Sequence, residues 1–160
     1  GNVYYVYAHG GLDSVWTDPA QAVLQADSRT GVVLNRAQQY VWERGNIKTQ
    51  LTLNTEDVPE VIRSGSWDKG KLQEGLGDSG TVIDLTGCSL ENVLYEISAQ
   101  RAVIAKTGAD TSVVIVGYDA YNTWLLDPAT GEVSPYGMND STALFQQAGN
   151  VFISYLDNQK

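Results

Sequence analysis

"TSVVIVGYDAYNTWLLDP", residues 111–128, decides how the second half of the chain folds. It contains two apolar runs, 113–116 and 123–126, on either side of a Gly-Tyr-Asp turn. Runs of this length and composition predict two antiparallel strands joined as a hairpin. Asp127 and Pro128 follow, a pair that predicts a turn in which the carboxylate accepts backbone N–H groups. The stretch contains no histidine or cysteine, so by itself it predicts a fold rather than a reaction.

Strand and helix signals continue in both directions from this hairpin. In the first half they predict a strand, a helix, two short strands around a polar turn, a further strand and a short helix, at 2–8, 17–31, 31–46, 48–55 and 54–65. In the second half they predict a strand, a helix and a strand before the hairpin, and an extended piece, a helix and a strand after it, at 81–86, 89–100, 102–107, 132–137, 139–149 and 150–156. Strands outnumber helices and most neighbours are joined tightly. We therefore expect an α+β fold with a mainly antiparallel sheet packed by helices.

Burial can also be predicted for single residues. Helical spacing directs Val23 and Leu24 of the first helix toward the core. Trp42 and Trp124 have apolar neighbours in the sequence, and we expect both in the core. Trp16 and Trp67 have polar or glycine-rich neighbours, and we expect both to be exposed. The glycine-rich segment 64–80 predicts a mobile surface loop with at most one helical turn, at 69–74.

Length and composition indicate one soluble globular domain that spans residues 1–160, with 42% hydrophobic and 18% charged residues. Its apolar runs are of strand length, so no insertion into a membrane is expected. No signal peptide is visible at the start. An isolated Gly1 is compatible with the scar of a removed tag, and we expect the domain to come from a longer protein.

The formal net charge of −9 is unevenly distributed, because no Lys or Arg lies between Lys106 and Lys160. Nucleic acids and anionic membrane surfaces are bound through Lys and Arg, so both kinds of partner are disfavoured. The simplest role of the negative charge is to keep the domain soluble.

Cysteine and histidine occur once each, as Cys88 and His9. One cysteine cannot form an internal disulfide, and with one histidine it cannot build a zinc site, so no metal or other cofactor is predicted. Cys88 lies just before a predicted helix, a position that lowers the pKa of a thiol. A Cys88–His9 dyad is therefore one hypothesis, although a small semi-buried cysteine at a strand–helix junction is the favoured interpretation.

The second half resembles the double-glycine leader peptidases, which are bacteriocin-processing cysteine peptidases with a papain-like fold. The resemblance rests on a helix followed in order by "RAVIAKTG", "TSVVIVGYD", "TWLLDPATGE", the helix "STALFQQAG" and the strand "VFISYL". The residues that match the family pattern are Gly117, Tyr118, Asp119, Asp127, Pro128 and Gly131. In that family a catalytic histidine opens the strand before the Gly-Tyr turn, and an orienting aspartate precedes the proline. The resemblance implies a papain-like fold and, from extracellular relatives, a secreted or cell-surface bacterial protein.

The chain departs from the family at its catalytic positions. Thr111 occupies the position of the histidine, while Asp127 occupies that of the aspartate, and the first half contains no cysteine to act as nucleophile. Threonine can neither activate a thiol nor carry a proton to a leaving group at neutral pH. An aspartate with no imidazole to orient has no role of the triad type. We therefore expect a degenerate member of the family that lacks catalysis.

Three functions follow as hypotheses. The first is a non-catalytic module of a bacterial cell-surface or secreted protein, which binds an extended peptide or protein segment in a groove beside Thr111, Tyr118 and Trp124. The second is an active cysteine hydrolase that uses Cys88 with His9. The third is a purely structural domain of a larger protein. The sequence indicates neither the identity of a ligand nor an oligomeric state.

Overall fold

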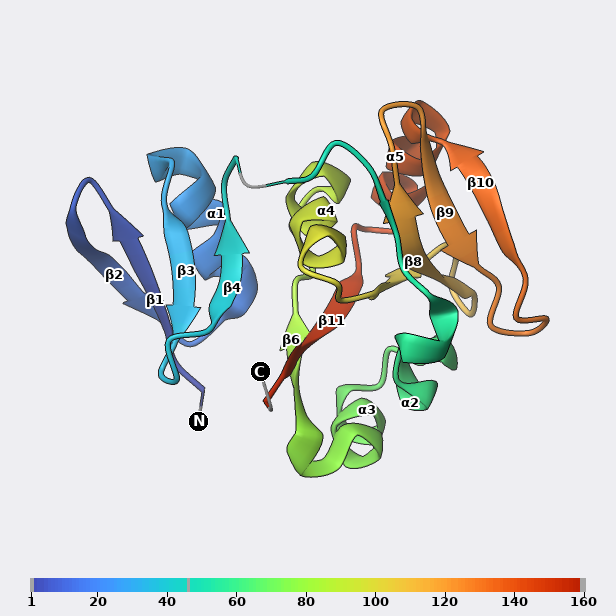
Figure 1. Cartoon of the computed structure of the whole chain (residues 1–160), viewed down its shortest axis with the longest axis horizontal. Helices are drawn as coiled ribbons and strands as arrows, with labels where there is room; N and C mark the ends of the chain where they lie inside the picture. Colours follow the sequence, from blue (N-terminus) through green and yellow to red (C-terminus); the bar gives the residue numbers. More distant parts are fainter. Residues whose placement is uncertain (1, 46, 159–160) are drawn as a thin grey trace.

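Two antiparallel β-sheets with helices packed on them make up the computed structural model, which describes residues 2–45 and 47–158 (Figure 1). The smaller sheet has the strand order β2-β1-β3-β4, and its strands are β1 (Tyr4–Ala8), β2 (Gly11–Trp16), β3 (Val32–Asn35) and β4 (Tyr40–Glu43). Helix α1 (Pro19–Arg29) packs against this sheet. We call residues 2–45 the N-terminal lobe and residues 47–158 the C-terminal lobe.

The larger sheet lies in the C-terminal lobe and has the order β10-β9-β8-β7-β11-β6, with β5 paired to β8. Its strands are β5 (Leu51–Thr52), β6 (Gly80–Asp84), β7 (Val103–Lys106), β8 (Ser112–Tyr118), β9 (Asn122–Leu126), β10 (Val133–Gly137) and β11 (Phe152–Asp157). The helices of this lobe are α2 (Glu60–Arg63), α3 (Lys69–Leu76), α4 (Leu90–Ser98) and α5 (Met138–Gln147), with short 3₁₀ turns η1 (Thr55–Asp57) and η2 (Gly77–Ser79).

Helices cover both faces of the larger sheet. Side chains of α4 and α5 belong to one cluster of buried residues, and those of α2 and α3 belong to another. Strand β8 supplies both clusters in alternation, because Ile115 packs with the first while Val114 and Val116 pack with the second. This alternation is the period of two that a strand between two helical layers requires. The expected α+β fold with antiparallel strands packed by helices is confirmed, although the strands form two sheets where one was expected.

The helix ends follow the signals in the sequence. The Asp18 carboxylate caps α1 by accepting the Ala20 N–H at 2.9 Å. Ser89 and Asn92 form a reciprocal capping box at the start of α4. After α1 the chain passes close to β1, since a Cβ added to Gly31 would lie only 2.5 Å from the Tyr7 carbonyl oxygen. Glycine at this position therefore allows α1 to lead directly into β3.

Several local expectations need correction. Strand β2 was not expected, and it arises because Ala8 pairs with Gly11 across a turn in which His9 and Gly10 both have positive φ. Segment 64–80 contains the helix α3, capped by the Asp68 carboxylate, and this helix extends beyond the single turn expected at 69–74. Leu24 is 37% exposed, whereas Val23 is buried, because the sheet contacts a narrower stripe of α1 than the spacing suggested.

The tryptophans also differ in part from expectation. Trp42 is buried in the core, as predicted. Trp16 and Trp67, which we expected to be exposed, are half-buried against the two core clusters. The Trp16 indole donates to Ser14 Oγ at 2.7 Å, and the Lys106 ammonium lies 5.0 Å from the centre of the Trp67 ring. Trp124, expected in the core, is likewise half-buried.

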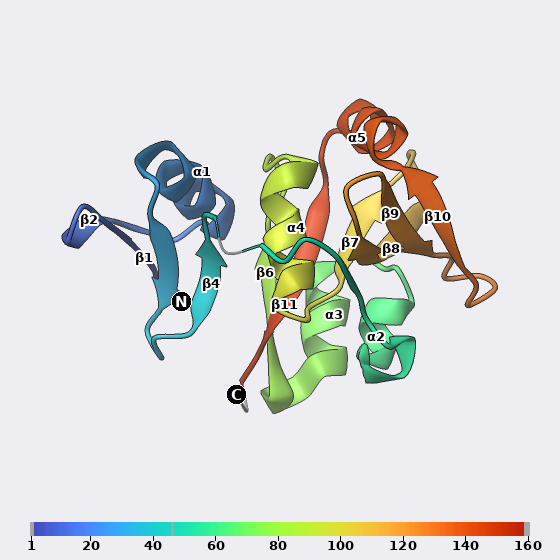
Figure 2. The same ribbon diagram turned by 45° about the horizontal axis from the view of Figure 1, so that its top comes forward.

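The two lobes meet where β4 packs against α4 (Figure 2). The Trp42 indole N–H of β4 donates to the Asn92 carbonyl oxygen of α4 at 2.9 Å, and its ring lies 6.4 Å from that of Tyr95. One cluster of buried residues contains side chains from both lobes, among them Val33 of β3 and Ile97 of α4. Across the two described segments, no helix is long and apolar enough to span a membrane.

Candidate functional site

The two positions that resemble a histidine–aspartate pair lie in separate turns. Thr111 is exposed in the turn before β8, where its hydroxyl accepts from the Thr107 hydroxyl at 2.8 Å. Asp127 is exposed after β9, and its carboxylate accepts the Ala129 N–H at 2.9 Å, as the turn prediction required. Each of these two hydrogen bonds stays within its own turn. They stabilise the turns and do not join the two side chains into a catalytic pair.

The chain between α2 and α3 covers the same end of the hairpin. The Ser112 hydroxyl donates to the Gly65 carbonyl oxygen at 2.6 Å. A Cβ added to Gly65 would lie 2.6 Å from Ser112 Oγ and 2.6 Å from Pro128 Cγ, so the backbone is in close contact with both residues. Backbone of the connection between α2 and α3 therefore occupies the space beside Ser112 and Pro128, whereas Thr111 itself stays exposed.

Tyr118 and Trp124 point to opposite faces of the larger sheet. Tyr118 pairs with Thr123, whereas Trp124 pairs with Gly117, and paired residues share a face. Tyr118 is buried in the cluster beneath α4 and donates to the Lys48 carbonyl oxygen at 2.6 Å. Trp124 packs with the cluster beneath α2 and α3. The groove expected beside Thr111, Tyr118 and Trp124 therefore has no common surface, because the strand register separates its members.

Cys88 is a core residue. It has no exposed surface, and its thiol approaches the Ala20 carbonyl oxygen at 3.8 Å. Burial, with a contribution from Glu96, raises the pKa of the Cys88 thiol to about 12. A thiol with so high a pKa is almost entirely protonated at neutral pH, and the thiolate is the nucleophilic form.

His9 lies on the opposite side of the N-terminal lobe from α4. It is exposed in the turn between β1 and β2, and β2 is the edge strand furthest from β4, the strand that α4 contacts (Figure 1). Cys88 precedes α4 and packs against α1. The structure therefore does not bring Cys88 and His9 together as a dyad.

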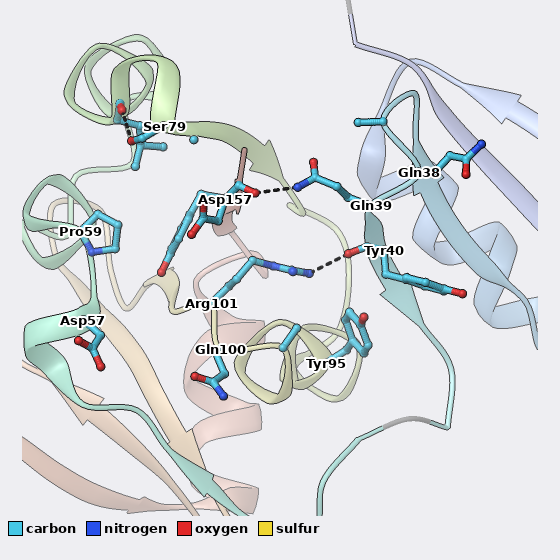
Figure 3. Close-up of a pocket in the computed structure, with 15 residues that line it drawn as sticks. Gln38, Gln39, Tyr40, Asp57, Pro59, Ser79, Tyr95, Gln100, Arg101 and Asp157 are labelled. Carbon is cyan, nitrogen blue, oxygen red and sulfur yellow. Dashed lines mark hydrogen bonds between the residues drawn. The ribbon is translucent and has the colours of Figure 1, made fainter. Parts of the chain in front are cut away.

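A cavity of about 730 Å³ lies between the two lobes (Figure 3). It is formed by the β3–β4 turn on one side and by η1, the start of β6, the end of α4 and the end of β11 on the other. Its lining residues are Ala37, Gln38, Gln39, Tyr40, Asp57, Pro59, Leu76, Ser79, Gly80, Tyr95, Ala99, Gln100, Arg101, Tyr155 and Asp157. Figure 3 shows Gln39 and Tyr40 facing Asp157 and Arg101 across this space, and the Gln39 side chain donates to the Asp157 carbonyl oxygen at 2.7 Å.

Arg101 joins the lobes at this cavity. Its Nη2 donates to the carbonyl oxygens of Tyr40 and Val41 in β4, at 3.2 and 3.3 Å. The same nitrogen and Nε donate to Glu96 Oε1 of α4 at 2.8 and 3.0 Å. The Arg101 side chain is 14% exposed and that of Glu96 is fully buried. Arginine suits this position because its planar group donates in several fixed directions at once.

Glu96 is a strongly perturbed carboxyl beside the cavity. Burial raises its pKa to about 7, and this effect outweighs the opposite effect of the Arg101 guanidinium. Its second oxygen, Oε2, is buried without a hydrogen-bond partner among the described residues. Burial also raises the pKa of the neighbouring Tyr95 hydroxyl to about 12 and that of the Tyr155 hydroxyl.

The cavity offers hydrogen-bonding groups and aromatic surface rather than a nucleophile. Its polar side chains are amides, two carboxylates, a hydroxyl and a guanidinium, and its ring surface comes from tyrosines. The polar residues are Gln38, Gln39, Gln100, Asp57, Asp157, Ser79 and Arg101, and the tyrosines are Tyr40, Tyr95 and Tyr155. Neither Cys88 nor His9 lines it. No group of three or more His, Cys, Asp or Glu side chains in the described part of the chain could hold a metal ion.

This cavity is not predicted by local sequence patterns, because its walls come from segments that are distant in the chain. One signal could have pointed to it. Glu96 follows Val93 by one helical turn and adjoins Ile97, so an acidic residue lies on the apolar face of the predicted helix. A buried acid needs a cation, and Arg101 follows just after the helix.

Comparison with known proteins gives limited information. No protein-family model matches the chain, and no curated protein matches it. One solved structure with a similar fold is that of a protein from Bacillus anthracis provisionally described as a C39-like peptidase. The two chains are 20% identical, with a TM-score of 0.49, and the similarity covers 55% of this chain and 56% of that one. A similarity of this extent assigns neither an activity nor a site.

Proposed function

We propose that this chain is a non-catalytic, peptidase-like module that binds a peptide or protein segment in the cavity between its two lobes. The observation that carries the proposal is the cavity of about 730 Å³ around Arg101, which joins hydrogen-bonding groups to tyrosine rings. Concave sites with a few convergent polar groups and an apolar or aromatic lining are the usual binding sites of proteins. In this proposal the parent protein is bacterial and lies at the cell surface or is secreted.

The absence of catalysis in this proposal rests on three placements. Cys88 is a buried, protonated thiol, His9 is on a distant hairpin, and Thr111 is in a turn at the position where the family has its histidine. A cysteine peptidase needs a thiolate beside an imidazole. The geometry therefore favours binding over hydrolysis.

A phage-displayed library of random peptides tests the binding site. The wild-type chain should enrich a set of peptides, and the variant Ala37→Trp should bind them at least about tenfold more weakly, because an indole would fill the cavity. Ala37 is exposed in the β3–β4 turn and has no contact with the Arg101–Glu96 pair among the hydrogen bonds described. The matched control is Ala109→Trp, an exposed position in the β7–β8 turn outside the cavity.

Unchanged binding by Ala37→Trp, or no enriched peptide, would overturn the assignment of the cavity. Mass spectrometry of the bound peptides tests the non-catalytic part separately. Cleavage products that disappear in Cys88→Ala or His9→Ala would show a hydrolase instead.

A further inference from the structure

Strand β2 is an open edge of the smaller sheet. It pairs with β1 on one side, and both views of the ribbon place nothing beyond its other side (Figures 1 and 2). No backbone hydrogen bond among the described residues reaches β2 except through β1. Because Ala8 and Gly11 close a two-residue hairpin turn, the N–H and C=O groups of the next residue, Leu12, point away from β1. An open edge of this kind is a template for a further strand.

The three other terminal strands of the two sheets are blocked. Along β4, the Arg101 guanidinium donates to the carbonyl oxygens of Tyr40 and Val41. Along β6, the Gln73 side chain donates to the Gly80 carbonyl oxygen at 2.9 Å and accepts the Val82 N–H at 3.0 Å. Strand β10 contains Pro135, which lacks an N–H group. Natural sheets block edges in these ways and also with bulges. Strand β2 has a bulge at Asp13, but no hydrogen bond among the described residues reaches the outward groups of Leu12.

The sheet face beside this edge is apolar and uncovered. Helix α1 covers the other face, where Tyr4 and Val6 are buried. On the uncovered face, Tyr7 pairs with Leu12 and Tyr5 pairs with Val15. Leu12 is 56% exposed, Val15 is 52% exposed and Tyr7 is 39% exposed. Leu12 and Val15 share this face although they are three residues apart, because Asp13 is the extra residue of a bulge. A strand added at β2 would place its own apolar side chains beside them on this face.

We propose that β2 binds an extended peptide segment as an additional antiparallel or parallel strand, with apolar side chains alternating on the uncovered face. The open backbone groups select an extended chain, since no other ligand presents N–H and C=O groups at the spacing of a strand. The net charge of −9 favours a neutral or basic segment. The Asp13 carboxylate within β2 is already engaged, because it lies 3.8 Å from Arg29 Nε and accepts from Gln25 at 3.0 Å. A second copy of the chain carries the same net charge of −9, so we assign the segment to another protein. This surface is separate from the cavity around Arg101.

The probe is a synthetic capped peptide of alternating valine and lysine, titrated into the isotope-labelled chain and followed by NMR. Amide resonances of β2 should shift, and the outward N–H of Leu12 should become protected from hydrogen exchange. The same peptide with alternate amides N-methylated along one edge should bind at least tenfold more weakly, because it cannot complete the ladder. A peptide of alternating valine and glutamate should also bind more weakly.

Variants give the second measurement. The double variant Leu12→Thr, Val15→Thr keeps strand propensity, removes apolar contact and should reduce affinity for the valine–lysine peptide at least tenfold. The matched control is Val133→Thr, an exposed valine on the blocked strand β10. The Ala37→Trp variant should bind the peptide as the wild type does, so failure of the cavity proposal leaves this one standing.

Three results would overturn the proposal: shifts that avoid β2, equal binding of the N-methylated peptide, or equal binding by the double threonine variant. Sedimentation of the chain without peptide tests the alternative occupant. Concentration-dependent dimers that the double variant abolishes would assign the edge to a second copy.

Discussion

The residue whose chemistry the fold changes most is Cys88. As a thiol before a helix it has the sequence position of a reactive cysteine, yet it lies in the core between α1 and α4. Burial away from solvent raises the pKa of the Cys88 thiol, and nearby carboxylates, Glu96 foremost, raise it further. Together these effects outweigh the lowering of the pKa that a helix N-terminus would give.

Thiol labelling checks this conclusion. With a pKa of about 12 instead of 9, the thiolate fraction of Cys88 at pH 8 should be about a thousandfold lower than that of an unfolded chain. Ellman's reagent should therefore label the native chain very slowly and label it quickly in urea. Rapid labelling of the native chain would contradict the buried placement.

Glu96 predicts a dependence of stability on pH. Its pKa is raised from 4.5 to about 7 by folding, so the native state holds a proton that the unfolded state releases. The contribution of Glu96 to the free energy of unfolding is therefore fully present below pH 4.5. It should fall by about 3 kcal/mol as the pH rises to 7. Urea unfolding at a series of pH values measures this change.

The matched variant is Glu96→Gln, which keeps an acceptor for Arg101 and cannot ionise. Its free energy of unfolding should vary much less between pH 4.5 and 7 than that of the wild type. A variant with the same slope as the wild type would assign the pH dependence to other carboxyl groups.

At the scale of elements, the connection from α1 to β3 depends on one close approach. A Cβ at Gly31 would meet the Tyr7 carbonyl oxygen at 2.5 Å and the Ala8 Cβ at 3.1 Å, and neither is the end of a flexible side chain. With any side chain at residue 31, α1 could lead into β3 only if the backbone of the N-terminal lobe shifted.

The variant Gly31→Ala should lower the free energy of unfolding by about 1–3 kcal/mol, because the added methyl group overpacks this site. Gly11→Ala is the control, since no atom lies within 4 Å of its added Cβ. It should change stability by no more than about 0.5 kcal/mol. Chemical denaturation of both variants compares them, and equal losses would show that the contact at Gly31 is relaxed without cost.

Local signals predicted most elements of the C-terminal lobe. The helix at 89–100, the hairpin of β8 and β9 and the Asp127 turn are each set by neighbouring residues, and each was predicted from the sequence. Strand β2 was missed because "GLDSVW" alternates poorly, and a bulge between Val6 and Tyr7 disturbs its register with β1. Tertiary pairing with β1, rather than propensity, makes it a strand.

The candidate site was less predictable, for a different reason. Whether Tyr118 and Trp124 share a face depends on the register between β8 and β9, and that register includes a shift between Ile115 and Gly117. The cavity around Arg101 depends on how β4 packs against α4, which involves residues far apart in the chain. Neither property is encoded in a local pattern.

At the scale of the whole molecule, the two lobes share one cluster of buried residues. Side chains from β1, β3 and β4 pack in it with side chains from α4, α5 and β11. Separation of the lobes would expose apolar surface of both and break the bonds between Arg101 and β4. Neither lobe should then persist for long without the other.

Calorimetry tests this coupling. We expect one transition, with a calorimetric enthalpy equal to the van't Hoff enthalpy, because both lobes lose their shared core together. Two resolved transitions, or a ratio of the enthalpies well above one, would show that the lobes unfold independently. Circular dichroism followed over the same temperatures should give the same midpoint.

The position of Trp42 also makes the molecule optically informative. Its indole is 2% exposed and is fixed by the Asn92 carbonyl oxygen at the contact between the lobes, whereas the three other tryptophans are half-buried elsewhere. With those three replaced by phenylalanine and with excitation that tyrosine does not absorb, the remaining tryptophan fluorescence comes from this contact alone. A shift of its emission to longer wavelength would then mark the loss of this contact, and it should coincide with the single unfolding transition of the whole molecule.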